Sequence, residues 1–187
     1  MNPDHQIIRD ILSGNTEAFS ELVQKYQDKV LRLCFAMVGP SDAEDAAQEA
    51  FLKVYGSLSK FRGESSFSTW LYRVASNHCL DLLYKRKRQK EESLDSLNEK
   101  SGEGVFSDSP ASSPGRSADS LMRRETVLWI LERLSPEERR ILVLREIEGL
   151  SYIELSQTMG ISMDLVKVRL FRARKAFSKE AKNHGLI

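Results

Sequence analysis

The chain has 187 residues, and its 28 lysines and arginines nearly balance its 27 aspartates and glutamates, which leaves a net charge of +1 at neutral pH. The composition is that of a soluble globular protein. No apolar run approaches the roughly 20 residues needed to span a bilayer, which excludes an integral membrane protein. The N-terminal segment lacks the basic and apolar regions of a signal peptide. Cys34 and Cys79 are too few and too far apart in sequence for a disulfide scaffold, so we expect a cytoplasmic protein with buried, reduced thiols.

Positive charge is gathered in two zones. Five of the six residues from Lys85 to Lys90 are basic, and the segment from Lys167 to Lys182 has seven basic residues against a single acid. Two such zones indicate a protein that touches a polyanion at two places. The intervening residues 91–120 are rich in Ser, Gly, Pro and acidic side chains and offer little to bury, so we expect a flexible linker there. The linker divides the chain into one domain over 1–90 and another over 121–187.

The first domain is predicted to be helical throughout. A long first helix ends at Gly39-Pro40, a pair that interrupts helices. A second helix is expected over Ser41–Leu58, a polar loop over Ser59–Ser68 and a third helix over Phe67–Arg88. No segment alternates with period two long enough to argue for a strand. The three predicted apolar stripes are Phe19, Leu22, Val23, Tyr26, Val30, Leu33, Cys34 and Met37; Ala47, Ala50, Phe51, Val54 and Leu58; and Leu71, Val74, Ala75, His78 and Leu82.

The second domain is predicted to begin with two helices. The first covers about Leu121 to Leu134. The next begins at Ser135-Pro136, where a capping residue is followed by proline and by acid in the first turn, and it runs to Gly149.

A helix-turn-helix is predicted to follow, over Leu150–Phe177. Ser151 and Glu154 fit a capping box, Gly160 can adopt the left-handed conformation that ends the first helix, and Ser162 can cap the second. The stripe that the second helix must bury is Val166, Leu170, Ala173 and Phe177. The predicted fold class is therefore all-α, with two small helical domains joined by a flexible linker and a helix-turn-helix in the C-terminal one.

The final helix presents a basic face opposite its buried stripe. A packed helix pair with such a face is how a helix-turn-helix enters the major groove of DNA. A solvated charged helix is the alternative interpretation of this segment. The face carries Asp164, Val168, Phe171, Arg172 and Lys175, with Lys167, Arg169 and Arg174 on its flanks.

The third helix of the first domain has an outer face that is unusual for a solvent-exposed surface. Exposed helix faces commonly carry Glu and Lys, whereas this one carries Trp70, Arg73, Asn77, Leu80 and Tyr84. Aromatic rings beside Arg and Asn can stack unpaired bases and read their edges. The basic run that continues from this helix would hold backbone phosphate. The alternative is that Trp70 and Tyr84 pack against another helix or the loop, since aromatic residues usually lie in the core.

The second helix has an acidic outer face instead, formed by Asp42, Asp45, Glu49 and Leu52 with Gln48 nearby. A negative helix cannot sit on DNA, but it suits a protein partner with a basic surface, with Leu52 as a small apolar anchor. A solvated acidic face is the alternative. A metal site is disfavoured, because the acidic residues of this helix, which include Glu44, do not converge on one point at their spacing.

No combination of residues predicts catalysis or a cofactor. His78 and Cys79 together with Cys34 could suggest zinc, but His78 lies on one predicted core stripe and Cys34 on another, so a satisfied core is favoured. The sequence has no Gly-rich phosphate loop, nucleophile elbow or paired-carboxylate pattern. We therefore expect neither an enzyme nor a bound metal or cofactor.

Three blocks of the sequence resemble a known family. They are DAEDAAQEAFLKVY, then FRGESSFSTWLYRVASN, then LSPEERRILVLREIEGLSYIELSQTMGIS with VKVRLFRAR. In order, spacing and intervening linker the chain resembles an extracytoplasmic-function (ECF) sigma factor, a bacterial transcription initiation subunit of the sigma-70 superfamily. The resemblance covers nearly the whole chain.

The resemblance implies a role for each face. In such proteins the acidic helix docks on the coiled coil of the polymerase beta-prime subunit. The loop Phe61–Ser68 and the third helix open the minus-ten promoter element, and Asn77 lies where members place a residue over a flipped-out base. The helix-turn-helix reads the minus-thirty-five element, with Arg169 and Arg174 as phosphate contacts. The implied residues are, for polymerase, Asp42, Asp45, Gln48, Glu49, Leu52 and Tyr55; for minus-ten DNA, Phe61, Ser65, Ser66, Phe67, Trp70, Arg73, Asn77, Tyr84, Lys85, Arg86 and Arg88; and for minus-thirty-five DNA, Lys167, Val168, Arg169, Phe171, Arg172 and Arg174.

The same resemblance implies the partners. They are core RNA polymerase, through its beta-prime and beta subunits, promoter DNA, and an anti-sigma factor, which in this family is commonly membrane-bound. The chain itself would not insert into a membrane, although an anti-sigma partner can hold it at the inner membrane. The resemblance also implies a role in a stress response.

The chain departs from the family at two positions of the final helix. Leu165 replaces a threonine that could bind phosphate, and Val168 replaces a small hydroxyl residue on the groove-facing side. Val168 could contact a thymine methyl group instead. Two other functions stay open: a stand-alone helix-turn-helix regulator, which normally dimerises, and a protein-only adaptor that has lost DNA binding, which only Leu165 and Val168 support.

Overall fold

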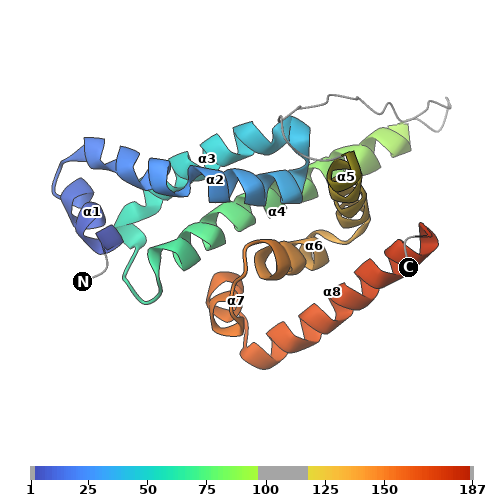
Figure 1. Ribbon diagram of the computed structural model, residues 1–187. Helices are drawn as coiled ribbons and strands as arrows, with labels where there is room; N and C mark the ends of the chain where they lie inside the picture. Colours follow the sequence, from blue (N-terminus) through green and yellow to red (C-terminus); the bar gives the residue numbers. More distant parts are fainter. Residues whose placement is uncertain (1–2, 97–117, 186–187) are drawn as a thin grey trace.

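The computed structural model describes residues 3–96 and 118–185 of the chain. Within these ranges every regular element is a helix (Figure 1), and the predicted all-α fold class is confirmed. The principal helices are α1 (Pro3–Leu12), α2 (Phe19–Val38), α3 (Ala43–Ser57), α4 (Phe67–Ser96), α5 (Ala118–Arg133), α6 (Pro136–Leu142), α7 (Tyr152–Met159) and α8 (Met163–Asn183).

Helices α2, α3 and α4 pack together and form the core of the N-terminal half. The predicted stripes supply this core, and Leu22, Val30, Leu33 and Val54 have almost no exposed surface. Gly39 ends α2 with φ +90°, a value that favours glycine, and this lets the chain reverse into α3. The predicted end of this helix at Gly39-Pro40 is therefore confirmed.

Helix α1 was not predicted from the sequence. It is fixed by Asp4, a buried carboxylate that accepts hydrogen bonds from the Tyr26 hydroxyl at 2.7 Å and from the Lys25 ammonium at 2.5 Å. Ile8 and Ile11 are buried on the same helix. Burial and then the contact with Asp4 raise the pKa of Tyr26, so the phenol stays protonated and keeps donating.

Helix α4 runs to Ser96, eight residues beyond the end predicted at Arg88. The first six residues of the expected linker are therefore helical, and its last three begin α5. The remainder of the linker expected over 91–120, residues 97–117, lies outside the described residues.

The C-terminal half has the local signals that the sequence predicted. The capping box predicted at Ser151 with Glu154 is present, and the predicted cap at Ser135 also forms a capping box, with Glu138. Gly160 is left-handed, with φ +65° and ψ +36°, and the Ser162 side chain accepts from the amide of Leu165. The helix predicted to run to Gly149 is α-helical only to Leu142 and continues as a wider π-helical turn over Val143–Ile147.

The two halves are packed against each other rather than apart. Helices α6 and α7 lie against α4 (Figure 1), and one buried cluster continues through both halves. Arg139 donates to the carbonyl oxygen of Met37 at 2.6 Å, and Arg140 donates to the hydroxyl of Ser76 at 3.1 Å. Both arginines are buried, and burial lowers the pKa of each guanidinium group.

This packing corrects one prediction. Leu80 was expected on the outer face of α4, but it is buried. It lies one helical turn after Ser76, on the side of α4 that α6 covers. A sequence pattern read from one helix cannot reveal that a second domain will cover it.

Cys34 and Cys79 come together in the core although they are distant in sequence. Their sulfur atoms lie 3.7 Å apart, and neither residue is exposed. The hydrogen bond to Cys34 and then burial raise the pKa of the Cys79 thiol, so it is protonated. The expectation of two buried free thiols is confirmed. None of the helices in residues 3–96 and 118–185 combines the length and the apolar character that crossing a membrane requires.

Candidate nucleic-acid interfaces and docking face

The outward side of α3 forms an acidic and partly apolar surface, which we call the α3 face. Asp45, Gln48 and Glu49 are exposed, and Leu52 projects into solvent with 70% of its surface exposed. Tyr55 is also exposed, and its ring packs edge-on against Phe19, with 4.9 Å between the two ring centroids. Carboxylates around an unburied leucine give this face both charge and an apolar centre, which is the chemistry of a protein-docking surface.

A groove of 280 Å³ runs beside this face, between α2 and α3. Its walls combine apolar and acidic side chains, and Leu31 on α2 is exposed at its edge. The groove lengthens the surface that a partner helix could cover. Its lining is Val23, Gln27, Asp28, Leu31, Glu44, Ala47, Gln48 and Phe51.

Asp42 differs from the other acidic residues predicted for docking. Its carboxylate pairs with Arg86 on α4, and Arg86 also donates to the carbonyl oxygen of Val38 at 2.9 Å. Asp42 was predicted to bind polymerase and Arg86 to bind DNA. In this structure the two side chains form an ion pair with each other instead. The pair fixes the end of α2 and the start of α3 against α4.

An aromatic cluster supports the loop that precedes α4. The ring centroids of Phe61 and Trp70 lie 5.5 Å apart, and the centroid of Phe67 lies 5.8 Å from that of Phe61 and 5.9 Å from that of Trp70. Phe67 also packs against Tyr26 and is only 1% exposed. A side chain this deeply buried cannot touch DNA, so the prediction of Phe67 as a DNA contact is wrong. Its contacts instead hold Phe61 and Trp70 in place.

The serines of this loop are partly used in capping α4. The hydroxyl of Ser66 accepts from the amide of Thr69 at 3.1 Å and lies 2.8 Å from the Thr69 hydroxyl. Ser65 donates to the carbonyl oxygen of Ser66 at 3.3 Å. Both serines are partly exposed. Their hydrogen bonds set the start of α4, and with it the direction in which Trp70 projects.

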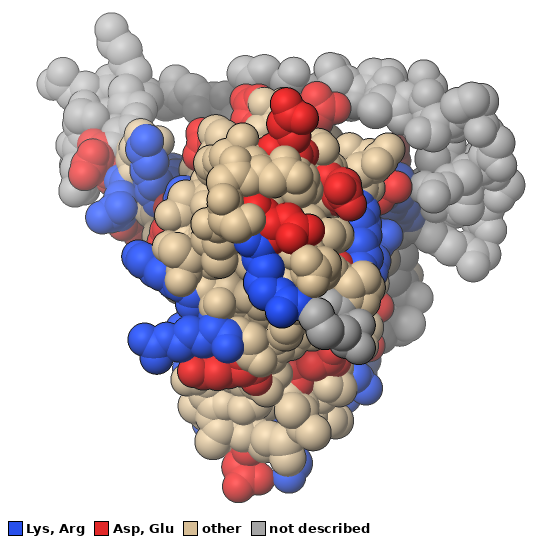
Figure 2. Space-filling model, turned by 90° about the vertical axis from the view of Figure 1, so that its left-hand side faces the viewer, with Lys and Arg blue, Asp and Glu red and all other residues tan. Residues whose placement is uncertain are grey.

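A cavity of 300 Å³ opens between this loop and α1. Phe61 forms an apolar wall, and Arg9 and Arg62 bring positive charge to the opening. Gly63 has φ +74°, and a side chain there would meet the His5 ring at 3.3 Å. The cavity could not be found from the sequence, because α1 itself was not predicted. Figure 2 shows this end of the molecule, where acidic and basic side chains are interspersed.

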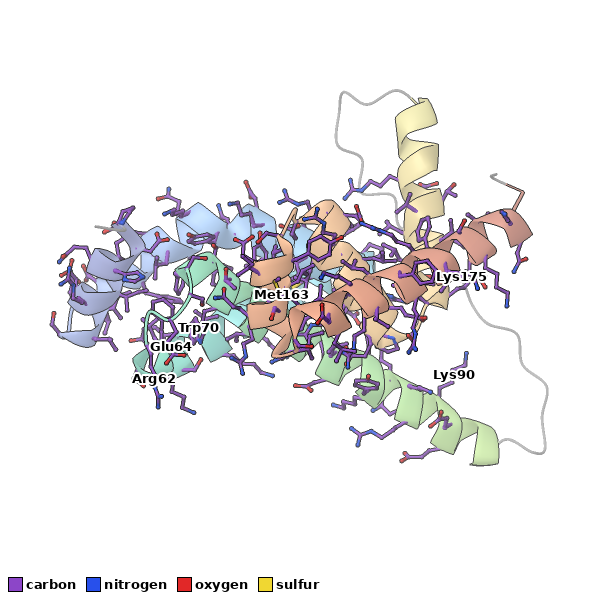
Figure 3. All side chains as sticks on the ribbon, turned by 90° about the horizontal axis from the view of Figure 1, so that it is seen from below. Arg62, Glu64, Trp70, Lys90, Met163 and Lys175 are labelled. Atoms are coloured by element: carbon purple, nitrogen blue, oxygen red, sulfur yellow. The ribbon has the colours of Figure 1, made fainter. Side chains whose placement is uncertain are left out.

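Beyond the loop, Arg73 and Asn77 are exposed on α4 at one and two turns after Trp70. Tyr84 is half-exposed, and burial and then Glu137 of the other half raise its pKa. Lys85 and Arg88 are exposed, and Figure 3 shows Lys90 at the far end of α4 from Arg62, Glu64 and Trp70. The predicted minus-ten residues therefore extend from the loop before α4 along most of that helix.

Helix α8 separates a buried side from an exposed side as predicted. Val166, Leu170 and Ala173 are buried, and Phe177 is half-buried. On the exposed side Phe171 is 69% and Val168 is 45% exposed, and Arg172 is exposed beside them. In Figure 3 Met163 marks the start of this helix, and Lys175 lies further along it, before its C-terminal end.

Three of the basic residues predicted on α8 are paired. Lys167 bonds Asp164 at 3.1 Å, Arg169 lies 3.8 Å from Glu137, and Arg174 contacts Glu146 at 2.7 Å. All three cations are substantially exposed, so these pairs are weak and can exchange for phosphate. Among the ion pairs of the described residues none includes Arg172, which lies on the same exposed side as Val168 and Phe171.

Within the described ranges, no three or more His, Cys, Asp or Glu side chains gather closely enough to hold a metal ion. His78 contacts Glu49 and Lys53 on α3 rather than the two cysteines.

Comparison with known proteins gives a consistent result. The profile of Sigma-70 region 2 matches residues 22–89, and the profile of Sigma-70, region 4 matches residues 124–177. The RNA polymerase sigma-H factor of Pseudomonas aeruginosa is 38% identical over 181 residues, which cover 94% of this chain and 92% of that protein. The ECF RNA polymerase sigma-E factor of Escherichia coli K12 is 35% identical over 178 residues, which cover 95% of this chain and 93% of that protein.

The chain belongs to the ECF sigma factors of the sigma-70 family.

Two solved structures share the fold of this sigma factor. CnrH, solved in complex with the cytosolic domain of CnrY, has a TM-score of 0.67 and 22% identity, with 96% of this chain and 97% of that one covered. The sigma factor RpoE of Bartonella quintana, solved with the anti-sigma factor NepR, has a TM-score of 0.62 and 19% identity, with 88% and 96% covered. Region 2 of this sigma factor contains the α3 face and most of α4, as far as residue 89, and region 4 contains the helix-turn-helix.

Proposed function

We propose that this sigma factor binds core RNA polymerase through the α3 face, opens the minus-ten element with the loop before α4 and with α4 itself, and reads the minus-thirty-five element with α8. The observation that carries the proposal is the presence of three chemically distinct exposed surfaces on one chain. One is acidic with an apolar centre, one is aromatic with exposed Arg and Asn, and one is basic on a helix-turn-helix.

For the polymerase contact, the exposed residues Asp45, Gln48, Glu49, Leu52 and Tyr55 are the candidates. Opposite charges on the two partners steer their encounter, and the burial of a central apolar residue away from water supplies binding energy. Asp42 belongs to this group only if its pair with Arg86 opens.

For the minus-ten element, Phe61, Trp70, Arg73 and Asn77 are the candidates. Unpaired bases stack on aromatic rings at about 1–3 kcal/mol per base, and an exposed amide can bond the edge of a base only after the duplex has opened. Lys85, Arg88 and Tyr84 extend this surface along α4 toward the backbone of adjacent DNA.

For the minus-thirty-five element, Val168, Phe171 and Arg172 are the candidates for base contacts. Arg172 can bond a guanine edge, whereas Val168 and Phe171 offer only apolar surface, which suits thymine methyl groups. Lys167, Arg169 and Arg174 are candidates for phosphate contacts.

An anti-sigma factor is the proposed regulator. One of the two structures that share this fold is named as a sigma factor in complex with an anti-sigma factor. We propose that this chain acts in the cytoplasm and is held inactive there by such a partner, without catalytic activity of its own.

Run-off transcription tests the proposal. Core polymerase is assayed on an ECF-type promoter with and without the chain, and a transcript is expected only with it.

A double charge reversal, Asp45→Lys with Glu49→Lys, should lower the affinity for core polymerase about tenfold or more, since like charges then meet across the interface. Glu91→Lys with Glu92→Lys makes the same change in net charge away from α3 and is the matched control. Sequence-specific repression or activation by the chain without transcript initiation would identify a stand-alone regulator instead.

A further inference from the structure

A buried histidine connects the α3 face to the helix that carries Asn77. His78 on α4 is 3% exposed, and both nitrogens of its ring approach charged side chains of α3. Its Nδ1 lies 2.8 Å from the ammonium of Lys53, and its Nε2 lies 3.2 Å from a carboxylate oxygen of Glu49. Lys53 follows Glu49 by one helical turn, so the ring bridges two residues of the same helix.

The partners fix the state of the ring. A lysine ammonium only donates hydrogen bonds, so Nδ1 accepts and the proton of the neutral ring lies on Nε2, directed at Glu49. The 3.2 Å contact between Nε2 and the Glu49 carboxylate lacks the alignment of a hydrogen bond. Nε2 is therefore a buried nitrogen whose nearest acceptor is imperfectly placed. Burial and then the Lys53 charge lower the pKa of His78, while Glu49 and Asp81 act in the opposite direction. These are the charged groups that act on the ring, and because burial and Lys53 outweigh the two carboxylates, the ring is neutral at neutral pH.

The ring also separates Glu49 from Lys53. A Glu four residues before a Lys on a helix is in the favourable orientation for a direct ion pair. Among the ion pairs of the described residues, none joins these two side chains. Lys53 donates to the buried ring instead, and the Glu49 side chain remains 58% exposed on the α3 face. The negative charge of Glu49 is therefore available to a partner.

We propose that His78 is a positioning residue for polymerase docking: it holds the Glu49 carboxylate at the α3 face and keeps Lys53 from neutralising it. The inference rests on the proposed function, because the placement of Glu49 matters only if the α3 face binds polymerase. Since Asn77 directly precedes His78, the same contact ties the docking helix to the helix that carries the proposed minus-ten residue.

A double-mutant cycle with the full-length chain tests this role. The measurement is the affinity for core polymerase by titration, without DNA. Glu49→Gln should weaken binding, and His78→Leu should weaken it by a similar factor, roughly three- to tenfold. The double variant should bind no more weakly than either single variant, because His78 acts through Glu49. His78→Leu with Asp45→Asn is the matched control, and its effects should multiply, since Asp45 has no contact with the ring.

Two conservative variants separate positioning from packing. The amide nitrogen of Gln reaches the place of Nε2, whereas the amide of Asn reaches only the place of Nδ1. His78→Gln should therefore restore polymerase affinity, and His78→Asn should not, although both fill less of the core than histidine. Thermal unfolding of each variant shows whether a loss of affinity merely follows a loss of fold, and the Gln and Asn pair decides the matter if His78→Leu does not fold.

The outcomes distinguish this inference from the function on which it rests. If Glu49→Gln binds polymerase as tightly as the unmodified chain, the assignment of Glu49 to the docking face fails, and the role of His78 fails with it. If Glu49→Gln weakens binding but the effect of His78→Leu multiplies with it, the docking face stands and the positioning role is overturned. Equal affinities of His78→Gln and His78→Asn would overturn it as well.

Discussion

The hydroxyl of Tyr72 on α4 donates a 2.6 Å hydrogen bond to the carboxylate of Glu148, which lies just before the helix-turn-helix. The same carboxylate accepts two bonds from Arg32 on α2, at 2.8 and 3.0 Å, and the Glu148 side chain is fully buried. Burial and then the bond to Glu148 raise the pKa of Tyr72, so the phenol remains a donor. A buried carboxylate needs such partners, and here all of them come from the other half of the chain.

We expect Glu148→Ala to loosen the packing of the two halves. It removes the acceptor of Tyr72, a buried residue, and leaves its hydroxyl without that hydrogen bond, which costs about 1–3 kcal/mol. Arg32 is half-exposed and can return to water, so it adds little. Urea unfolding of the full chain, followed by circular dichroism, measures the effect. Glu146→Ala is the control, because Glu146 is exposed and pairs with Arg174 inside the same half. Equal unfolding midpoints for the two variants would contradict the role of Glu148.

The features that the sequence predicted correctly are local ones. The helix cap at Ser135, the capping box at Ser151 and the left-handed turn at Gly160 depend on residues a few positions apart, so a short stretch of sequence contains all the information. The buried stripe of α8 follows in the same way from the helical period. The separation of Val168 and Phe171 from that stripe, which defines the proposed groove-facing side, was therefore predictable.

The features that the sequence did not predict depend on distant partners. Arg139 is buried, and its guanidinium donates a hydrogen bond to the carbonyl oxygen of Met37, which lies 102 positions earlier in the sequence. Leu80 and Phe67 are buried by surfaces that lie elsewhere in the chain. The contact of His78 with Glu49 and Lys53 arises only when α3 and α4 pack. No periodic pattern within one helix encodes such contacts.

The stability of the chain should fall in mild acid through His78. Its pKa in the folded state is lowered below the usual 6.5, chiefly by burial. As the pH falls below 6.5, the unfolded state binds this proton before the folded state does, so the free energy of unfolding declines until the pH reaches the lowered folded pKa. His78→Gln removes this group, and its unfolding free energy should decline less over the same range. Urea unfolding from pH 7.5 downward checks the difference, and parallel pH profiles would refute it.

Asn77→Ala should impair promoter opening more than promoter binding. The side chain is exposed, so the fold should be unaffected, and base edges become accessible to it only in the unpaired strand. Permanganate footprinting of the minus-ten thymines with reconstituted holoenzyme measures opening. A pre-melted template should partly rescue the variant. Gln89→Ala removes another exposed amide from α4 and is the control. Thymine reactivity equal to that of the unmodified chain would count against Asn77.

Loss of the Trp70 ring should have two separable effects. Trp70→Ala removes a stacking surface worth about 1–3 kcal/mol per base, and it also removes packing against Phe61 and Phe67. The first effect should appear as reduced opening and the second as a lower unfolding midpoint. Trp70→Phe should keep most of the packing and part of the stacking. Full opening by Trp70→Ala at a temperature where it is folded would exclude the stacking role.

The preference for minus-thirty-five sequences should be set by Arg172 and Val168. Both are exposed on the side of α8 opposite the buried stripe, so substitution should spare the fold. Arg172 can make two hydrogen bonds to a guanine edge, which discriminate against a wrong base by roughly 1–3 kcal/mol. Arg172→Ala should therefore relax selection at one position, whereas Val168→Ser should shift it away from thymine. Lys167→Ala removes a phosphate contact, so it should weaken binding to all sequences alike. It should also reduce the slope of the logarithm of affinity against the logarithm of salt concentration by about one. Selection from a randomised minus-thirty-five library with holoenzyme measures all three variants, and an unchanged consensus for Arg172→Ala would show that this side of α8 does not face the groove.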